Sequence, residues 1–288
     1  MIVDAHTHSW PRWPYRPPVP DRQTRGCYQQ LIHEMDAAGV DQAVVVSAAL
    51  PGDPANLDNN DYVAGAAAAH PGRLCQFADL DSRWSESYHR AGASGRLTEL
   101  CDRLSPAGVS HYLAAGNDGW LRSGEGQAFF AAAARRGLIV SLAAAPAWFA
   151  DVCAVAASLP QTPVLLNHLA LVMMHEDGVG AGLDLVRKGA GQHNLIVKVS
   201  GYYYGHDRPW RYPFTDRLEI VRAFYESWGP HRMVWASDYP NCAPHITYRQ
   251  SLEVLRAEAG FIAPADLPLV LGGTMRALLD GRQPAGPA

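Results

Sequence analysis

Short apolar segments rich in β-branched residues recur along the chain, and helix-like stretches separate them. The apolar segments lie at about 2–5, 41–47, 73–79, 107–112, 138–143, 163–167, 194–199 and 232–237. After the first of them, Tyr28, Leu31, Ile32 and Met35 follow the spacing of a helix face, and Gly39 is a natural helix end. Further helices are predicted over 61–69, 125–136, 147–158, 180–188 and 216–227.

Eight strands that alternate with helices predict an α/β protein, a single-domain closed parallel (β/α)8 barrel. The strands are apolar on both faces, as expected where helices cover a barrel from outside. A doubly wound open sheet is the alternative, but no Gly-rich phosphate turn follows the first strand. We expect the barrel to span residues 1–280 and the Pro- and Gly-containing segment 281–288 to be a flexible tail.

Ligand-type residues end three of the predicted strands. His6 and His8 end the first strand and point the same way, because side chains alternate along a strand. His168 and Asp238 end strands far downstream. The carboxyl ends of barrel strands meet at one mouth, so we expect these four side chains to converge there. Imidazoles and a carboxylate at one point suit either a divalent metal or acid–base chemistry.

Composition and charge exclude several classes of binding partner and location. The chain has 288 residues with a net charge of −4 and no basic stripe, which argues against nucleic acid. No apolar run approaches the ~20 residues of a membrane span, and the start does not resemble a signal peptide. Five widely spaced cysteines suit reduced thiols. We therefore expect a cytoplasmic protein that acts on a small molecule, with homo-oligomerisation left open.

Four motifs in order carry a family resemblance. The segments 2–10 (IVDAHTHSW), 166–169 (LNHL), 197–201 (VKVSG) and 235–240 (WASDYP) resemble the amidohydrolase superfamily, in the branch of 2-pyrone-4,6-dicarboxylate lactonase and sugar-acid lactonases. The resemblance extends to residues 270–274 (VLGGT). It implies that Asp238 is the general base and that His168 polarises the reacting carbonyl or positions the nucleophile. It also implies that His6 and His8 bind a divalent metal, as in most branches, or act without metal, as in some lactonases.

Two departures from the family pattern concern the metal ligands and the substrate-binding groups of the site. The strand at 138–142 ends without the histidine of metal-rich relatives. The strand at 108–111 carries neither a bridging lysine nor the arginine with which similar lactonases hold a substrate carboxylate. We therefore expect one divalent ion, preferably Zn²⁺, on His6, His8 and Asp238, with a metal-free site as the alternative.

The resemblance and the intact acid–base set predict a lactonase that opens a small carboxylated or sugar-acid lactone with water activated by Asp238. Two alternatives remain at this stage. One is a metal-dependent decarboxylase of an aromatic or unsaturated acid, and the other is a degenerate barrel that only binds ligands. Polar and aromatic residues that follow strands on the same side are candidates for substrate contact, or else pack within their loops. They are His111, Tyr202, Tyr204, His206, Arg208 and His245.

Lys198 lies in a predicted strand whose inward set is Ile196, Lys198 and Ser200. An unpaired interior ammonium is costly, so Lys198 needs a partner. Strict alternation in the first strand places Asp4 on the inward face with His6. We therefore predict a buried, structural Asp4–Lys198 pair below the site.

Overall fold

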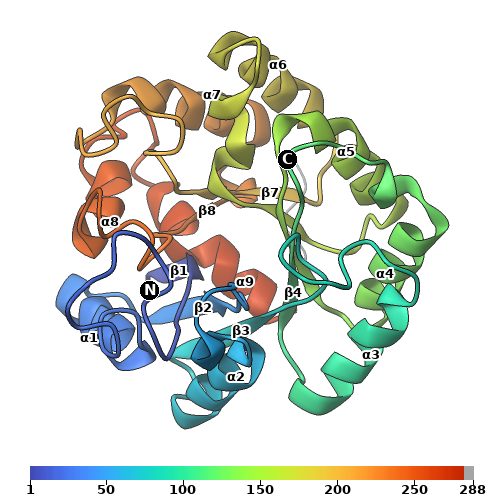
Figure 1. Ribbon diagram of the computed structural model, residues 1–288. Coiled ribbons are helices and arrows are strands. Elements are labelled where there is room, and N and C mark those ends of the chain that lie inside the picture. Colours follow the sequence, from blue (N-terminus) through green and yellow to red (C-terminus); the bar gives the residue numbers. More distant parts are fainter. Residues whose placement is uncertain (282–288) are drawn as a thin grey trace.

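The computed structural model, which describes residues 1–281, is a ring of eight parallel strands surrounded by helices (Figure 1). Each strand pairs in parallel with the next along the chain, in the order β1 to β8. The strands are β1 Val3–Thr7, β2 Gln42–Val46, β3 Leu74–Asp79, β4 Gly108–Tyr112, β5 Ile139–Ala143, β6 Val164–Leu166, β7 Leu195–Val199 and β8 Met233–Trp235. The predicted (β/α)8 barrel is confirmed.

Helices follow the strands, and all but the last of them cover the outside of the ring. They are α1 Tyr28–Ala38, α2 Asn59–Ala69, α3 Ala93–Leu104, α4 Gly124–Arg135, α5 Phe149–Ser158, α6 Val179–Gly189, α7 Leu218–Trp228, α8 Tyr248–Arg256 and α9 Thr274–Leu279. The predicted helices match these bounds to within a few residues at each end, while α3, α8 and α9 were not among them. The predicted tail, apart from Gly281, lies outside the described residues.

The first and last strands meet through residues next to the predicted site. Asp238 N donates to His6 O at 2.9 Å, and His8 N donates to Tyr239 O at 2.6 Å. Thr7 and Tyr239 form a parallel bridge. The backbone that completes the ring therefore also fixes His6, His8 and Asp238 relative to one another.

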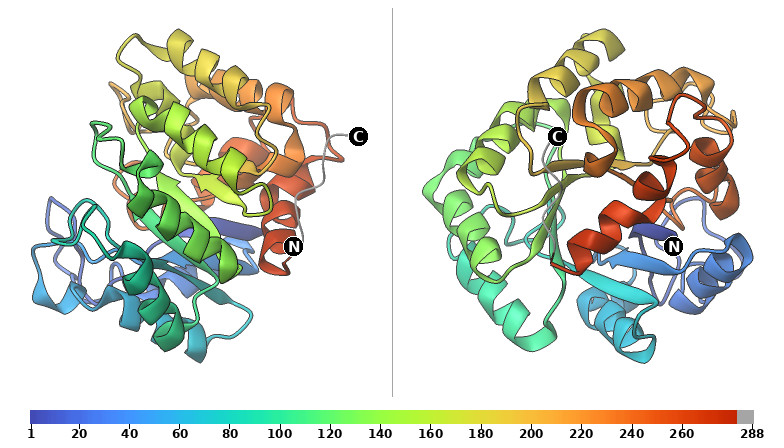
Figure 2. Two further views of the ribbon diagram at one scale, coloured as in Figure 1. Left: turned by 90° about the vertical axis from the view of Figure 1, so that its right-hand side faces the viewer. Right: turned by 180° about the vertical axis from the view of Figure 1, so that it is seen from behind.

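An apolar layer fills the lower part of the barrel. It contains Val3, Ala5, Val44, Val46, Phe77, Ile139, Leu165, Ile196, Val234 and Ala236. Met275 and Leu278 of α9 belong to the same cluster, and the view from behind shows α9 crossing this end of the barrel (Figure 2). One end is thus closed by packing, which leaves the opposite end, where the strands terminate, for the polar side chains.

A bulge in β1 changes which side chains point inward. Asp4 pairs with Ala43 and Thr7 with Val45, so three steps on β1 oppose two on β2. Val3 and Ala5 are in the interior cluster, so Asp4 between them faces the helices. The extra residue reverses the alternation and turns His6 and His8 toward the barrel mouth. The prediction that Asp4 and His6 share one face is therefore wrong.

Candidate active site

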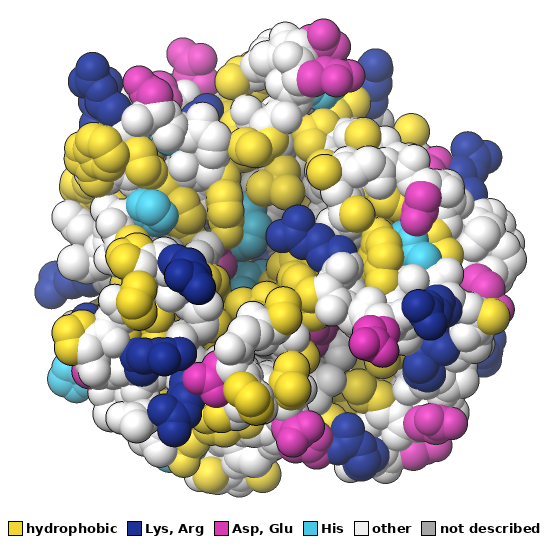
Figure 3. Space-filling view, in the orientation of Figure 1, with side chains coloured by type: hydrophobic (Ala, Val, Ile, Leu, Met, Phe, Trp, Pro, Cys, Tyr) yellow, Lys and Arg dark blue, Asp and Glu magenta, His cyan; other side chains and the backbone are white. Residues whose placement is uncertain are grey.

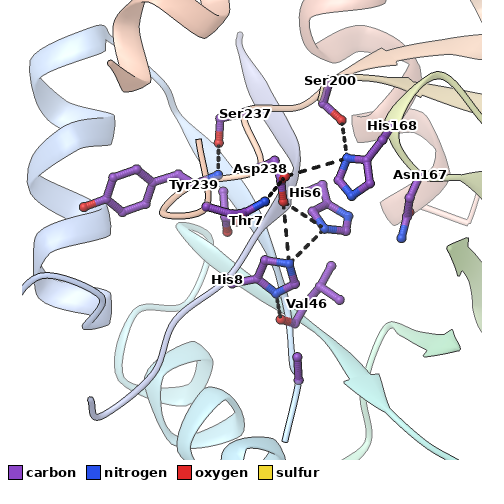
Figure 4. Close-up of polar contacts among 12 residues, drawn as sticks. His6, Thr7, His8, Val46, Asn167, His168, Ser200, Ser237, Asp238 and Tyr239 are labelled. Atoms are coloured by element: carbon purple, nitrogen blue, oxygen red, sulfur yellow. Dashed lines mark hydrogen bonds and ion pairs between the residues drawn. The ribbon is translucent and has the colours of Figure 1, made fainter. Parts of the chain in front are cut away.

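The four predicted side chains meet at the barrel mouth (Figure 4). Nε2 of His6 and Nε2 of His8 are 3.1 Å apart, and they lie 3.6 and 3.7 Å from Oδ1 of Asp238. His168 Nδ1 lies 3.9 Å from the other carboxylate oxygen, Oδ2. None of the four residues is more than 5% exposed. The structure brings the set together from β1, from the turn after β6 and from the turn after β8.

Unusual backbone conformations hold two of these residues. His168 has φ of 55° and Asp238 has φ of 60°, and Leu169, Ala170 and Leu171 continue the left-handed turn. Such conformations cost about 1–3 kcal/mol each in non-glycine residues and concentrate at functional sites. Gly201, with φ of 69°, lets two side chains approach, since a Cβ there would lie 2.5 Å from Tyr204 and 2.8 Å from His168.

Three donors hold one oxygen of Asp238. Oδ2 accepts hydrogen bonds from Tyr203 Oη at 2.5 Å, Tyr204 Oη at 2.9 Å and Asn241 Nδ2 at 2.9 Å. Burial opposes ionisation, but the imidazoles of His168 and His8 and these hydrogen bonds outweigh it and hold the pKa of Asp238 below its usual value. The carboxylate is therefore ionised at neutral pH, and Oδ1 is the oxygen left for chemistry.

The hydrogen bond of His8 fixes its tautomer. Nδ1 lies 2.7 Å from the carbonyl oxygen of Val46, and a carbonyl can only accept, so Nδ1 carries the proton. Burial lowers the pKa of His8 to about 4, although Asp238 opposes this shift. The neutral ring therefore presents the lone pair of Nε2 toward Asp238 and His6.

Lys198 contacts His6 rather than Asp4. Its Nζ lies 3.0 Å from His6 Nδ1 and 2.8 Å from Ser141 Oγ, whereas Asp4 Oδ1 accepts the backbone N–H groups of His6 and Ser237. The predicted Asp4–Lys198 pair is wrong, because the bulge turns Asp4 out of the barrel. Burial lowers the pKa of Lys198 to about 7, against the attraction of Asp4 and Asp238.

The donor set suits one divalent ion. One ligand atom from each of His6, His8 and Asp238 lies within 4.8 Å of the other two, and this is the only such group within residues 1–281. Two nitrogens and one oxygen form a common zinc set with an open position. His8 Nε2 and Asp238 Oδ1 are free to ligate. His6 Nε2 can ligate when Nδ1 carries the proton. The Nδ1–H group then donates a hydrogen bond to the neutral amine of Lys198.

A cavity of ≈ 240 Å³ lies over this group. His8, His168 and Asp238 form its base, while Trp10, Tyr15, Trp84 and Tyr112 contribute aromatic surface. The space-filling view shows histidine in a central hollow at this end of the molecule, with a basic side chain beside it (Figure 3). Tyr15 reaches the cavity from the Pro-rich first loop. The Tyr112 hydroxyl lies 3.4 Å from Nε2 of both His6 and His8.

The six predicted substrate-contact residues do not all lie at the cavity. Tyr204 lines the cavity. His111 is buried on the outer face of β4, 3.2 Å from His89 through their Nε2 atoms. The remaining four residues do not line the cavity: Tyr202 packs on Phe214, His206 pairs with Asp216, Arg208 lies beside Asp207, and His245 stacks on Tyr203. Substrate contact by these residues stays a prediction.

Several residues at the site were not predicted from sequence. Tyr112 packs against the interior apolar cluster, whereas Val109, and with it His111, lies on the outer face of β4. The apolar pattern of β4 does not mark which of its faces is inward. Tyr203 adjoins the predicted Tyr204, and Asn241 follows Asp238 by three residues, so proximity in sequence was the available signal. Arg83 and Trp84 reach the cavity from the loop after β3.

Comparisons with known proteins agree with this geometry. A model of the amidohydrolase family matches residues 3–281, so the chain is an enzyme of the amidohydrolase family, as the motifs predicted. No curated protein matches the chain. Among solved structures, an amidohydrolase from Burkholderia multivorans with bound zinc is 18% identical, with 97% of this chain and 99% of that chain covered and a TM-score of 0.77.

Two further solved structures represent different reactions on this fold. A putative 2-pyrone-4,6-dicarboxylic acid hydrolase from Pseudomonas putida is 21% identical, with 97% of each chain covered and a TM-score of 0.70. A 5-carboxyvanillate decarboxylase from Sphingomonas paucimobilis is 16% identical, with 97% of this chain and 98% of that chain covered and a TM-score of 0.64. At these identities the likeness shows the fold alone. In the described part of the chain, no helix is long and apolar enough to cross a membrane.

Proposed function

We propose that the protein is a lactonase that opens a small carboxylated or sugar-acid lactone. The observation that carries this proposal is that the two carboxylate oxygens of Asp238 have different surroundings. Tyr203, Tyr204 and Asn241 saturate Oδ2, so Oδ1 faces the imidazoles as an ionised, partly unsatisfied acceptor. Such an oxygen is suited to take a proton from a water molecule held between itself and the imidazoles.

The reaction follows from these positions. Asp238 Oδ1 removes a proton from water while the water oxygen forms a bond to the lactone carbonyl carbon. His168 and the Tyr112 hydroxyl, which both line the cavity, can donate hydrogen bonds to the oxyanion that develops. When the ring C–O bond breaks, Asp238 returns the proton to the leaving oxygen, and the product is an open-chain hydroxy acid.

A metal ion is compatible with the same residues. His6, His8 and Asp238 would hold one divalent ion, with Zn²⁺ our expectation, and such an ion polarises a carbonyl and lowers the pKa of water. In a metal-free site, His6 and His8 act as hydrogen-bonding partners of the water. The two versions differ in whether a chelator abolishes activity.

A panel of small lactones tests the proposal. Purified protein, with and without added Zn²⁺, is incubated with 2-pyrone carboxylates and sugar-acid lactones, and acid release is followed in a pH-stat. We expect hydrolysis of at least one lactone and its loss in Asp238→Asn. If neither form of the protein opens any lactone faster than buffer does, the proposal is wrong.

A decarboxylase is the second candidate, and the fold likeness to 5-carboxyvanillate decarboxylase favours testing it. In that reaction Asp238 or His168 would deliver a proton to carbon as carbon dioxide leaves. The absence of a histidine from β5, Ile139–Ala143, counts against it. Carbon dioxide release from carboxylated phenols, without lactone opening, would establish this alternative.

A further inference from the structure

The loop after β3 presents one basic side chain to the cavity. Arg83 lines the cavity wall together with Trp84. Arg83 is exposed, and its guanidinium makes no hydrogen bond or ion pair with any residue of the described chain, 1–281. Arg83 is also the only arginine or lysine that lines this cavity.

The backbone that carries Arg83 is held on both sides. Arg83 N donates to Tyr112 O at 2.9 Å. Ser82 Oγ donates to Asp79 Oδ1 and accepts from Tyr112 N at 2.9 Å. Trp84 Nε1 donates to Asp79 Oδ2 at 2.9 Å. An anchored loop that leaves an unpaired guanidinium at a cavity is preorganised to bind an anion.

The aromatic walls offer few free polar groups to a ligand. The indole N–H of Trp10 donates to Ala48 O at 2.7 Å, and that of Trp84 donates to Asp79. The hydroxyl of Tyr204 donates to Asp238. A polyhydroxylated ligand would replace only part of its hydrogen bonds to water here, whereas a flat ring would pack on these faces.

The size of the cavity sets a further limit. Its ≈ 240 Å³ is below the ~300–1,000 Å³ of most ligand pockets, so it suits a single ring. Among the side chains that line it, Arg83 is the only lysine or arginine. One fixed cation matches one carboxylate.

We propose that Arg83 binds the carboxylate of a planar, single-ring monoacid whose ring lies between the aromatic walls while its reacting carbon faces Asp238. The assignment rests on the proposed lactonase and deepens it, since it selects flat carboxylated rings over sugar acids. It places substrate selection on the loop after β3, where the sequence provides an arginine that β4 lacks.

Ligand binding without turnover tests the assignment. Calorimetry with wild-type protein compares benzoate with benzamide, which has the same shape without charge, and with gluconate, which has the charge without a flat ring. Arg83→Met removes the guanidinium. Arg90→Met is the matched control, because Arg90 is an exposed arginine of the same loop that does not line the cavity.

We expect wild type and Arg90→Met to bind benzoate equally, and Arg83→Met to bind it about 10- to 100-fold more weakly, the range for a hydrogen-bonded charge. Benzamide and gluconate should bind wild type more weakly than benzoate does. Equal benzoate binding by Arg83→Met and wild type, or no binding by wild type, would overturn the assignment. Gluconate binding as tight as benzoate binding would overturn the preference for a flat ring.

The same probes keep this inference separate from the proposed function. Benzoate has no lactone bond, so its binding does not depend on catalysis. Arg83-dependent binding in a protein that opens no lactone would leave the carboxylate site standing and reject the lactonase. Hydrolysis of 2-pyrone-5-carboxylate and of its methyl ester with equal kcat/KM would retain the lactonase and reject the role of Arg83.

Discussion

Replacing Asp238 by asparagine should abolish turnover while leaving the fold in place, and the structure gives the reason for both. Three donors point at the position of Oδ2, from Tyr203, Tyr204 and Asn241. The new side chain will therefore place its carbonyl oxygen there and its amide nitrogen at the position of Oδ1. An NH₂ group at that point donates hydrogen bonds and cannot remove a proton from water.

The expected size of the kinetic effect follows from general-base catalysis, which contributes about 10²–10⁴-fold. We expect kcat to fall by about 10³-fold or more. Stability should change little, because the hydrogen bonds survive in neutral form and a buried charge disappears. A change of about 1 kcal/mol would move Tm by roughly 2–4 °C in a protein of this size.

Two further variants complete the experiment. Asp238→Ala leaves all three donors without an acceptor, at about 1–3 kcal/mol for each buried group, so it should lower Tm well beyond Asp238→Asn. Asp58→Asn is the control, because Asp58 is exposed and its side chain makes no cap hydrogen bond at α2. Kinetics on the best lactone and thermal denaturation provide the readouts. Activity of Asp238→Asn within tenfold of wild type, or a Tm as low as that of Asp238→Ala, would refute the reasoning.

Three other predictions follow from the same geometry. Tyr203→Phe removes the 2.5 Å hydrogen bond to Asp238, so the pKa of the carboxylate should rise and the acid limb of kcat/KM should move to higher pH; an unchanged limb would contradict this. Chelation should stop activity if one metal ion is bound, and His8→Ala should then lower metal content and turnover together, whereas two ions per chain by elemental analysis would contradict the site. Burial raises the pKa of Asp79 to about 7 despite hydrogen bonds that include Trp84. The protonated Asp79 side chain therefore contributes to the stability of the folded state at low pH, and this contribution is lost as pH rises from about 4 to 7. Asp79→Asn should flatten the dependence of Tm on pH between about 4 and 7 relative to wild type, and identical profiles would contradict this prediction.

The sequence by itself determined the barrel and the set of residues at its mouth. Eight apolar runs separated by helices leave few other arrangements, because parallel strands need helical crossovers and bury both faces. Once that topology holds, His6, His8, His168 and Asp238 must meet, since all lie at or just after the carboxyl ends of strands. Long-range order therefore follows here from local patterns.

Tertiary structure alone decided how those residues are arranged. The bulge in β1 turns Asp4 outward, so Lys198 contacts His6 instead of Asp4. No sequence pattern marks this bulge, because the strand is buried on both sides. For the same reason the sequence did not distinguish Tyr112 from His111. Arg83 reaches the cavity through loop contacts that join segments far apart in the chain. In a barrel with both strand faces buried, alternation of polar and apolar residues disappears, so side-chain direction is set by register and packing.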